Sequence, residues 1–223
     1  GAVAAFRAGG GARRMEGMDK PLIALAGTPL IEWVIQRLAP QVSSTVISAN
    51  GAGDRFEPYG LPIVADRAAG FGPLAGMLAG LEWAGEHDPG ASHIAMVAAD
   101  TPFFPRDLVA RLAAVVGHRD AAMAASNGRL HPVFALVPIA AAGDLAAFLA
   151  EGGSQRVGDW LARLGATPVS FDLLPGSVDP FFNVNTPGDL TEAAAWAARC
   201  ASLWLGGMMA ERARPAAAAE QQP

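Results

Sequence analysis

Residues 3–20 read Val-Ala-Ala-Phe-Arg-Ala-Gly-Gly-Gly-Ala-Arg-Arg-Met-Glu-Gly-Met-Asp-Lys. A short apolar run comes first, and three consecutive glycines, two arginines and a lysine follow it. Glycine lets backbone N–H groups approach phosphate oxygens without a Cβ in the way, and the cations balance phosphate charge. A glycine run alone is more typical of a flexible surface loop, but the preceding strand and the cations favour a triphosphate cradle from Ala8 to Lys20. The loop is neither a Walker A motif nor a dinucleotide-binding fingerprint.

The rest of the chain alternates short apolar runs with amphipathic stretches. Continuous apolar runs predict buried strands at Val3 to Phe6, Thr45 to Ala49, Ile63 to Ala65, His93 to Ala98 and Val133 to Val137. Helical patterns cover Leu30 to Leu38, Leu74 to Trp83, Asp107 to Val116, Ile139 to Leu149 and Gln155 to Leu164. This alternation predicts a Rossmann-like α/β fold, in which a mainly parallel central sheet carries helices on both faces of a single three-layer domain.

Composition and periodicity set the expected domain limits. Of the 223 residues, 52% are hydrophobic and 17% charged, which is typical of a chain with one sizeable hydrophobic core. The periodicity decays after about Arg199, and residues 214–223 are of low complexity. We therefore expect the domain to cover residues 1–198 and a C-terminal extension, partly helical and then disordered, to cover residues 199–223.

Charge and cysteine content exclude several classes of partner. A net charge of −5 provides no broad cationic field for polymeric nucleic acid or an anionic membrane. The single cysteine, Cys200, excludes an internal disulfide and a multi-thiolate metal site, and it suits a reducing compartment. No apolar stretch has the pattern of an export signal or the length of a membrane span. We expect a cytoplasmic protein.

The ends of three predicted strands carry the residues of chemical interest. Parallel sheets bind ligands at the carboxyl ends of their strands. The first strand runs into the loop from Ala8 to Lys20, the third into Asp66, and the fourth into Asp100-Thr101-Pro102. We expect these segments to converge at one edge of the sheet.

Six motifs in one order suggest a family. After the loop come Gly27-Thr28-Pro29-Leu30-Ile31, Gly72-Pro73-Leu74-Ala75-Gly76, Asp100-Thr101-Pro102-Phe103, His131-Pro132 and Asn183-Val184-Asn185-Thr186-Pro187. Together they resemble the signature of the molybdenum cofactor guanylyltransferases, members of the wider nucleotide-sugar pyrophosphorylase-like group. The resemblance implies transfer of GMP from GTP to the terminal phosphate of molybdopterin, with release of pyrophosphate.

This reaction needs cations more than a base. The attacking phosphate monoester has a second pKa of about 6, so it is largely ionised near neutrality. Catalysis then depends on positioning and on charge neutralisation, for which Mg²⁺ is the natural cofactor. The resemblance makes Asp100 the metal ligand and adds Lys20 and Arg14 as catalytic residues. From the residues alone, Asp100 fits an Asx-turn or a helix N-cap equally well.

The resemblance also divides the remaining site residues between two substrates. Expected nucleotide contacts are Arg7, Ala8, Gly9, Gly10, Gly11, Lys20, Ser48, Asp66 and Asp100. Expected contacts to the second substrate are His131, Arg156, Asn183 and Asn185. The residues themselves leave other readings open: a structural histidine, a solvated arginine and turn-forming asparagines.

The chain departs from the family pattern beside the loop. Arg7 stands in place of an aliphatic residue, Ser48 in place of an asparagine and Glu16 in place of a glycine. These changes bear on affinity and base choice, which leaves cytidylyl or other nucleotidyl transfer, to molybdopterin or another phosphate acceptor, as an alternative. A non-catalytic nucleotide-binding adaptor is an alternative of another class. The implied partners are GTP, molybdopterin and proteins that mature molybdenum enzymes, and we expect a monomer or weak homo-oligomer.

Overall fold

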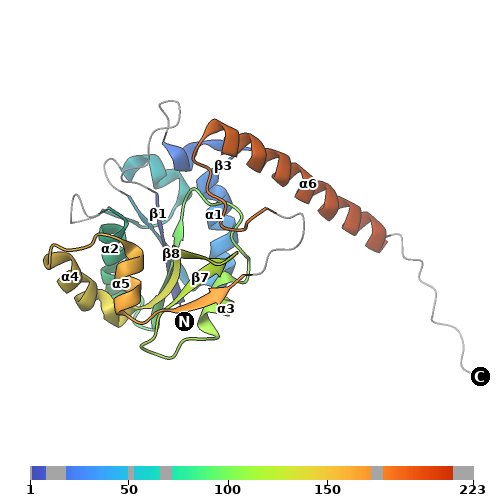
Figure 1. The fold of residues 1–223 in the computed structure, drawn as a ribbon. Helices are drawn as coiled ribbons and strands as arrows, with labels where there is room; N and C mark the ends of the chain where they lie inside the picture. The colour runs from blue at the N-terminus through green and yellow to red at the C-terminus, as the bar shows by residue number, and fades with distance from the viewer. Residues whose placement is uncertain (1, 9–18, 50–52, 66–71, 172–177, 213–223) are drawn as a thin grey trace, which may run out of the picture.

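A seven-stranded sheet forms the centre of the molecule (Figure 1), whose computed structural model describes residues 2–8, 19–49, 53–65, 72–171 and 178–212. The strand order is β5-β4-β1-β6-β8-β7-β9. The strands are β1 Ala2–Arg7, β4 Ser44–Ser48, β5 Ile63–Val64, β6 His93–Ala98, β7 Ala122–Ser126, β8 Arg129–Pro138 and β9 Thr167–Ser170. Of these seven strands, β8 alone runs antiparallel to its neighbours, β6 and β7. The predicted mainly parallel sheet is confirmed.

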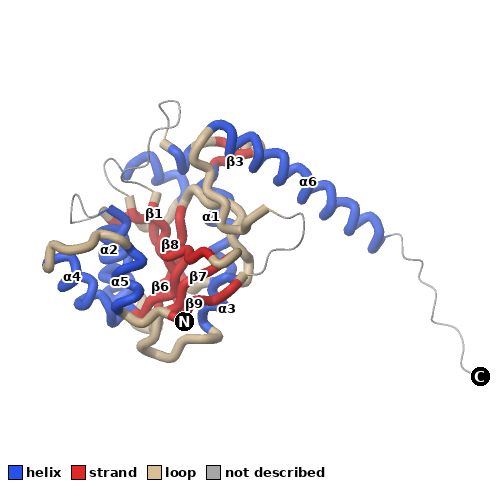
Figure 2. Tube along the Cα trace, viewed as in Figure 1, coloured by secondary structure: helices blue, strands red, loops and turns tan. Residues whose placement is uncertain are grey.

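Helices cover both faces of the sheet (Figure 2), as the sequence predicts. The helices are α1 Leu30–Leu38, α2 Gly72–His87, α3 Leu108–Ala113, α4 Ala142–Ala150, α5 Val157–Arg163 and α6 Pro187–Arg212. Short 3-10 helices are η1 Lys20–Leu22, η2 Ala39–Gln41, η3 Gly53–Tyr59 and η4 Ile139–Ala141. Helices α1 and α3 pack on one face, and α2, α4 and α5 pack on the other.

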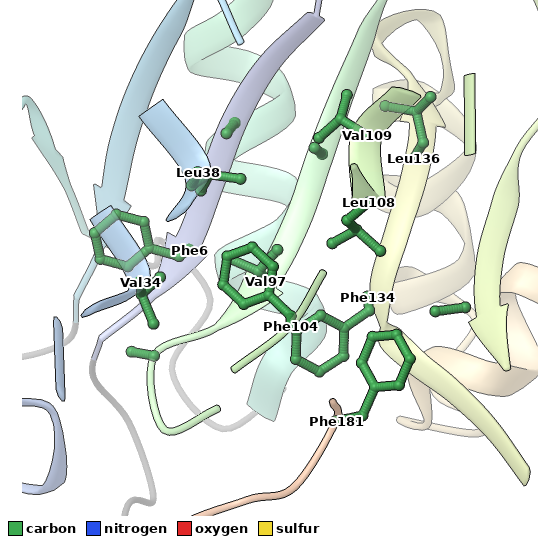
Figure 3. Close-up of a cluster of buried hydrophobic side chains, with 14 of the residues drawn as sticks. Phe6, Val34, Leu38, Val97, Phe104, Leu108, Val109, Phe134, Leu136 and Phe181 are labelled. Carbon is green, nitrogen blue, oxygen red and sulfur yellow. The ribbon is translucent and has the colours of Figure 1, made fainter. Parts of the chain in front are cut away.

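The two faces of β1 explain its continuous apolar run. Successive side chains of a strand point to opposite faces of the sheet. Ala4 and Phe6 lie in the core beneath α1 and α3, whereas Val3 and Ala5 lie in the core beneath α2 and α4. Figure 3 shows the first of these cores, where Phe6 lies beside Val34 of α1. A strand buried on both faces has no polar side to alternate with its apolar one.

Two strands of the central sheet, β7 and β9, were absent from the sequence prediction. Strand β7 joins β8 through the two-residue turn Asn127-Gly128, and both turn residues have positive φ angles, 49° and 70°. This is the backbone that a tight hairpin between right-twisted strands requires. Strand β9 pairs parallel with β7 at the edge of the sheet and contains Pro168, which edge strands tolerate.

A third apolar cluster attaches α6 to the domain. Strands β2 (Ala24–Leu25) and β3 (Thr28–Pro29) form a two-stranded ribbon beside it. The cluster draws on this ribbon region, on α1, on the loop after β6, on the segment before α6 and on α6 itself, through Ile23, Leu25, Leu30, Phe103, Val184, Ala193 and Ala197. The ring of Trp196 lies 4.4 Å from that of Phe103. Beyond this contact α6 extends away from the sheet as one helix and passes residue 199 without a break (Figure 1).

Among the helices of the described residues, none combines the length and the apolar character needed to span a bilayer.

Two glycines of α2 provide a test of how closely this helix packs on the sheet. A Cβ at Gly80 would lie 2.9 Å from the Cβ of Ala5, whereas a Cβ at Gly85 would meet Ile139 at an ordinary 3.5 Å. Both substitutions by alanine gain about 1 kcal/mol of helix propensity, but only Gly80→Ala forces the helix and sheet apart, at about 1–3 kcal/mol. In urea unfolding we expect Gly80→Ala to be less stable than Gly85→Ala by that difference. Equal stability of the two variants would contradict close packing at Gly80.

Candidate active site

The carboxyl ends of β5, β4, β1 and β6 lie in this order along one edge of the sheet, so the three strand ends of interest, those of β1, β5 and β6, share an edge as expected. The backbone N–H of Ala8 donates to the carbonyl of Ser48 at 2.8 Å, and the N–H of Ala49 donates to that of Val64 at 3.0 Å. On the other side of β1, Arg7 pairs with Ala98 of β6, two residues before Asp100. The first residue of the expected cradle and Asp100 therefore share one edge of the sheet.

Lys20 lies between two oxygen-bearing side chains at this edge. Its Nζ donates to Oδ1 of Asn185 at 2.5 Å and lies 3.8 Å from Oδ2 of Asp100. The lysine is only 8% exposed, and its backbone is held in η1 beside the buried Pro21. Three residues far apart in the chain thus form one cluster, with a cation fixed next to a carboxylate.

Asp100 is held through its own backbone and through its neighbour. Its carbonyl accepts the N–H of Val184 at 2.9 Å, and the fully buried Thr101 hydroxyl donates to Oδ1 of Asn183 at 2.5 Å. Burial raises the pKa of the Asp100 carboxyl, and the charge of Lys20 and the hydrogen bonds of the carboxylate offset only part of this rise. Its side chain is nevertheless 27% exposed. The site therefore holds a reachable carboxylate whose charge favours a further cation.

A helix cap fixes the segment that carries Asn185. Thr186 precedes Pro187 at the start of α6, and its hydroxyl accepts the N–H of Asp189 at 3.1 Å. In return, Oδ2 of Asp189 accepts the N–H groups of Asn185 and Thr186, both at 2.8 Å. This reciprocal arrangement is a capping box. Burial tends to raise the pKa of Asp189, but these backbone bonds and the Thr186 hydroxyl outweigh it, and the pKa is lowered.

The charged cap should contribute to the free energy of unfolding in a pH-dependent way. A depressed folded-state pKa means that the charged cap stabilises above the ordinary value of 3.8 and loses this contribution as pH falls through the folded-state value. We expect Asp189→Asn to cost about 0.5 kcal/mol at neutral pH, the low end for a cap because solvent screens the group. Urea unfolding should show that the difference in the free energy of unfolding between the parent and Asp189→Asn decreases at acidic pH. Asp159→Asn is the control, because Asp159 lies in the first turn of α5 but accepts the hydroxyl of Ser154 instead of backbone N–H groups; an equal loss there would argue against the cap.

The predicted second-substrate residue His131 lies in a polar network at the β7–β8 hairpin. Its Nε2 is 2.7 Å from the hydroxyl of Ser126, which also contacts both carboxylate oxygens of Asp179, at 3.1 and 3.2 Å. Burial lowers the pKa of His131, opposed by the charge of Asp179 and aided by that of Arg129. The structure therefore favours a neutral ring held by neighbouring side chains.

The other predicted contacts have different outcomes. Arg156 is exposed at the start of α5, whose Gly158 lies close to Pro132, the neighbour of His131 in sequence. Ser48 is fully buried, and its contact with a nucleotide stays a prediction. Several predicted residues lie outside the described part of the chain: Gly9, Gly10, Gly11, Arg14, Glu16 and Asp66. For Arg7 the backbone alone is described.

The sequence motifs assigned no function to some residues near the site. Asp19, next to Lys20, forms an ion pair with Arg55 of η3, with Nε and Oδ2 at 2.6 Å. The Arg55 guanidinium also lies 4.6 Å from the ring of Phe56. No local sequence pattern predicts such an ion pair, because Asp19 and Arg55 are distant in sequence. The capping box, by contrast, was missed although its Thr-Pro-x-Asp pattern lies within four consecutive residues and could have been recognised.

The donor set fits a hard divalent cation better than a soft one. Among the described residues, no group of three or more His, Cys, Asp or Glu side chains could hold a metal. Mg²⁺ needs no such cage, since it is usually bound through one or two carboxylates together with water and substrate phosphates. The single reachable carboxylate of Asp100 is compatible with that mode of binding.

Comparisons with known proteins agree on one family. The family described as MobA-like NTP transferase domain matches residues 5–166. A molybdenum cofactor guanylyltransferase from Bradyrhizobium sp. (strain ORS 278) is 48% identical, with 86% of this chain and 91% of the relative covered. One from Mesorhizobium japonicum is 44% identical, with 84% and 91% covered.

A solved structure adds the same assignment from the fold. Molybdopterin-guanine dinucleotide biosynthesis protein A from Archaeoglobus fulgidus aligns with a TM-score of 0.68 at 26% identity, covering 88% of this chain and 99% of that one. A nucleotidyl transferase from Methanothermobacter aligns with a TM-score of 0.70 at 18% identity, which supports the fold alone. The resemblance seen in the six motifs is confirmed: the chain belongs to the molybdenum cofactor guanylyltransferases, within the MobA-like NTP transferase family.

Proposed function

We propose that this protein transfers GMP from GTP to the terminal phosphate of molybdopterin, releasing pyrophosphate and forming the guanine dinucleotide cofactor. The family relationship supports this reaction. The observation that carries it within the chain is the cluster of Lys20, Asp100 and Asn185 at the carboxyl edge of the sheet. A fixed cation beside a carboxylate is what a reaction between two anionic phosphates requires.

Lys20 has the surroundings of an electrostatic catalyst. Its charge is largely shielded from solvent. In such surroundings a cation interacts with phosphate oxygens more strongly than it does in water. Asn185 and Asp100 hold Nζ in place before substrate binds, so little reorganisation accompanies the reaction. Lys20 would then offset the charge that develops on the departing pyrophosphate.

Asp100 would hold the divalent cation, which we propose to be Mg²⁺. When bound, this ion would neutralise phosphate charge and orient the triphosphate. Burial raises the pKa of Asp100, so an added cation is favoured beside the ionised carboxylate. Lys20 lies 3.8 Å away, a distance that leaves the carboxylate its capacity for a second partner.

The remaining residues are assigned to two sides of this cluster. Besides the catalytic Lys20, Arg14 and Asp100, we propose the following nucleotide contacts: Arg7, Ala8, Gly9, Gly10, Gly11, Ser48 and Asp66. For molybdopterin we propose the side of His131, Arg156, Asn183 and Asn185. The second group would lie beyond Asp100, on the side of the β7–β8 hairpin and of the segment before α6.

A direct assay tests the reaction. Purified protein, GTP, Mg²⁺ and molybdopterin should give equal amounts of pyrophosphate and guanine dinucleotide, and chelation of the metal should stop both. Failure to form either product, while both substrates bind, would contradict the proposal. Thermal shift with GTP, CTP, ATP and UTP tests base choice, since a ligand that binds the native state alone raises its Tm. A preference for CTP would favour cytidylyl transfer instead.

Three further expectations accompany this proposal. We expect a cytoplasmic location, on the evidence of the single Cys200. We expect a monomer or weak homo-oligomer that passes its product to proteins maturing molybdenum enzymes. We also keep residues 199–223 as an extension of the catalytic domain; truncation before residue 199 should leave activity in place.

A further inference from the structure

Ser126 and Asp179, which have no role in the proposed reaction, form a polar network with His131. Ser126 ends β7 and is only 3% exposed. Its hydroxyl lies 2.7 Å from Nε2 of His131 in β8, and 3.1 and 3.2 Å from the two carboxylate oxygens of Asp179. Three polar side chains from three segments thus meet at a buried oxygen.

The chemistry of the partners fixes the direction of these bonds. An ionised carboxylate can only accept, so the single hydroxyl hydrogen of Ser126 is directed to Asp179. The oxygen of Ser126 then accepts from His131, which must carry its proton on Nε2. This arrangement selects one tautomer and one orientation of the His131 ring.

Phe181 closes the network into a ring of contacts. Oδ1 of Asp179 accepts the N–H of Phe181 at 2.9 Å, and the Asp179 carbonyl accepts the N–H of Phe182 at 2.9 Å. The His131 ring in turn stacks on the Phe181 ring, with centroids 4.5 Å apart. Phe181 is 5% exposed and packs on Phe134. Hydrogen bonds hold the backbone of Phe181 while stacking holds its ring.

The same segment reaches the proposed catalytic cluster within four residues of Phe181. Asn183 accepts the Thr101 hydroxyl, Val184 donates to the Asp100 carbonyl, and Asn185 accepts from Lys20. The capping box fixes the far end of this segment, and the network around Ser126 fixes its near end. An apolar side chain could fill the space of Ser126 at lower desolvation cost, so the polar network is better explained by the geometry it imposes.

We infer that Ser126, His131 and Asp179 are positioning residues, which hold the segment 179–185 so that Asn183 and Asn185 meet Thr101 and Lys20. The inference rests on the proposed function, because its consequence is a change in the rate of nucleotidyl transfer. Groups that support catalytic residues in this way typically change activity by about 10–100-fold when removed.

The test compares two serines that each contact a histidine. Ser126→Ala removes the network. Ser92→Ala removes a similar contact, between Ser92 Oγ and His93 Nδ1 at 2.9 Å, at the end of β6 that is opposite to Asp100. We expect kcat to fall about 10–100-fold in Ser126→Ala with the KM for GTP nearly unchanged, and to change less than about twofold in Ser92→Ala. Both variants should be compared at equal folded fraction, measured by thermal unfolding.

Three outcomes are distinguishable. Parental kcat in folded Ser126→Ala would overturn the inference and leave the proposed function in place. An inactive parental protein would overturn the proposed function itself. If Ser126→Ala does not fold, Asp179→Asn replaces it, because it keeps the size of the side chain. A fall in kcat that is larger than the change in KM for GTP supports positioning, and an unchanged kcat overturns it.

Discussion

Asp100→Asn is expected to lower the rate of Mg²⁺-dependent pyrophosphate release by about a thousandfold, the effect of losing a principal electrostatic group. The amide is nearly the same size as the carboxylate, so Thr101 and Val184 keep their positions. What is lost is the negative charge that would hold the cation beside the triphosphate. Steady-state release of pyrophosphate from GTP in the presence of molybdopterin measures the effect.

A control and a stability measurement separate charge loss from damage to the fold. Asp107→Asn is the control, because Asp107 is an exposed carboxylate before α3 with no side-chain capping bond; its activity should remain within about twofold of the parent. Because burial penalises the ionised Asp100, the Asp100→Asn protein should be at least as stable as the parent without metal. Undiminished turnover in Asp100→Asn would remove Asp100 from the mechanism.

The fold was predictable where strands are buried on both faces. Runs such as Val3 to Phe6 and Ile94 to Ala98 consist of apolar residues without interruption, and the structure has strands there. Strand β7 was missed because Ala122–Ser126 is rich in alanine, which is depleted in strands. The turn Asn127-Gly128 that follows it is a strong hairpin signal, from which the missing strand could have been predicted.

The candidate site was predictable only as far as motifs reach. Lys20, Asp100, Asn183 and Asn185 belong to motifs, and the structure brings all four together. Ser126 and Asp179 belong to none, since each acts through partners that only folding brings near. Asp19 and Arg55 illustrate the same limit. Sequence patterns of short period identify elements and motifs, whereas contacts across the fold depend on register and on loop geometry.

Lys20→Met is expected to lower kcat by about a hundredfold or more, because it removes a preorganised cation from a site largely shielded from water. Methionine keeps an unbranched apolar stem at this buried position, so the fold should persist. Arginine should not restore activity, because its planar fork cannot place one nitrogen between Asn185 and Asp100 as the ammonium does. Single-turnover measurement with saturating GTP isolates the chemical step from binding.

A double variant tests whether the two residues act as one unit. If Lys20 and Asp100 neutralise the same phosphates together, the loss in Lys20→Met combined with Asp100→Asn should be much smaller than the product of the single losses. Arg163→Met serves as the control for the loss of an ion-paired cation. Arg163 pairs with Asp144 and Glu151, and it lies in α5, which packs on the same face of the sheet as α2 and α4. Multiplicative losses for Lys20 and Asp100 would mean that the two side chains act on different groups. The contact of 3.8 Å between them would then be structural, and a cation held by Asp100 would act without the help of Lys20.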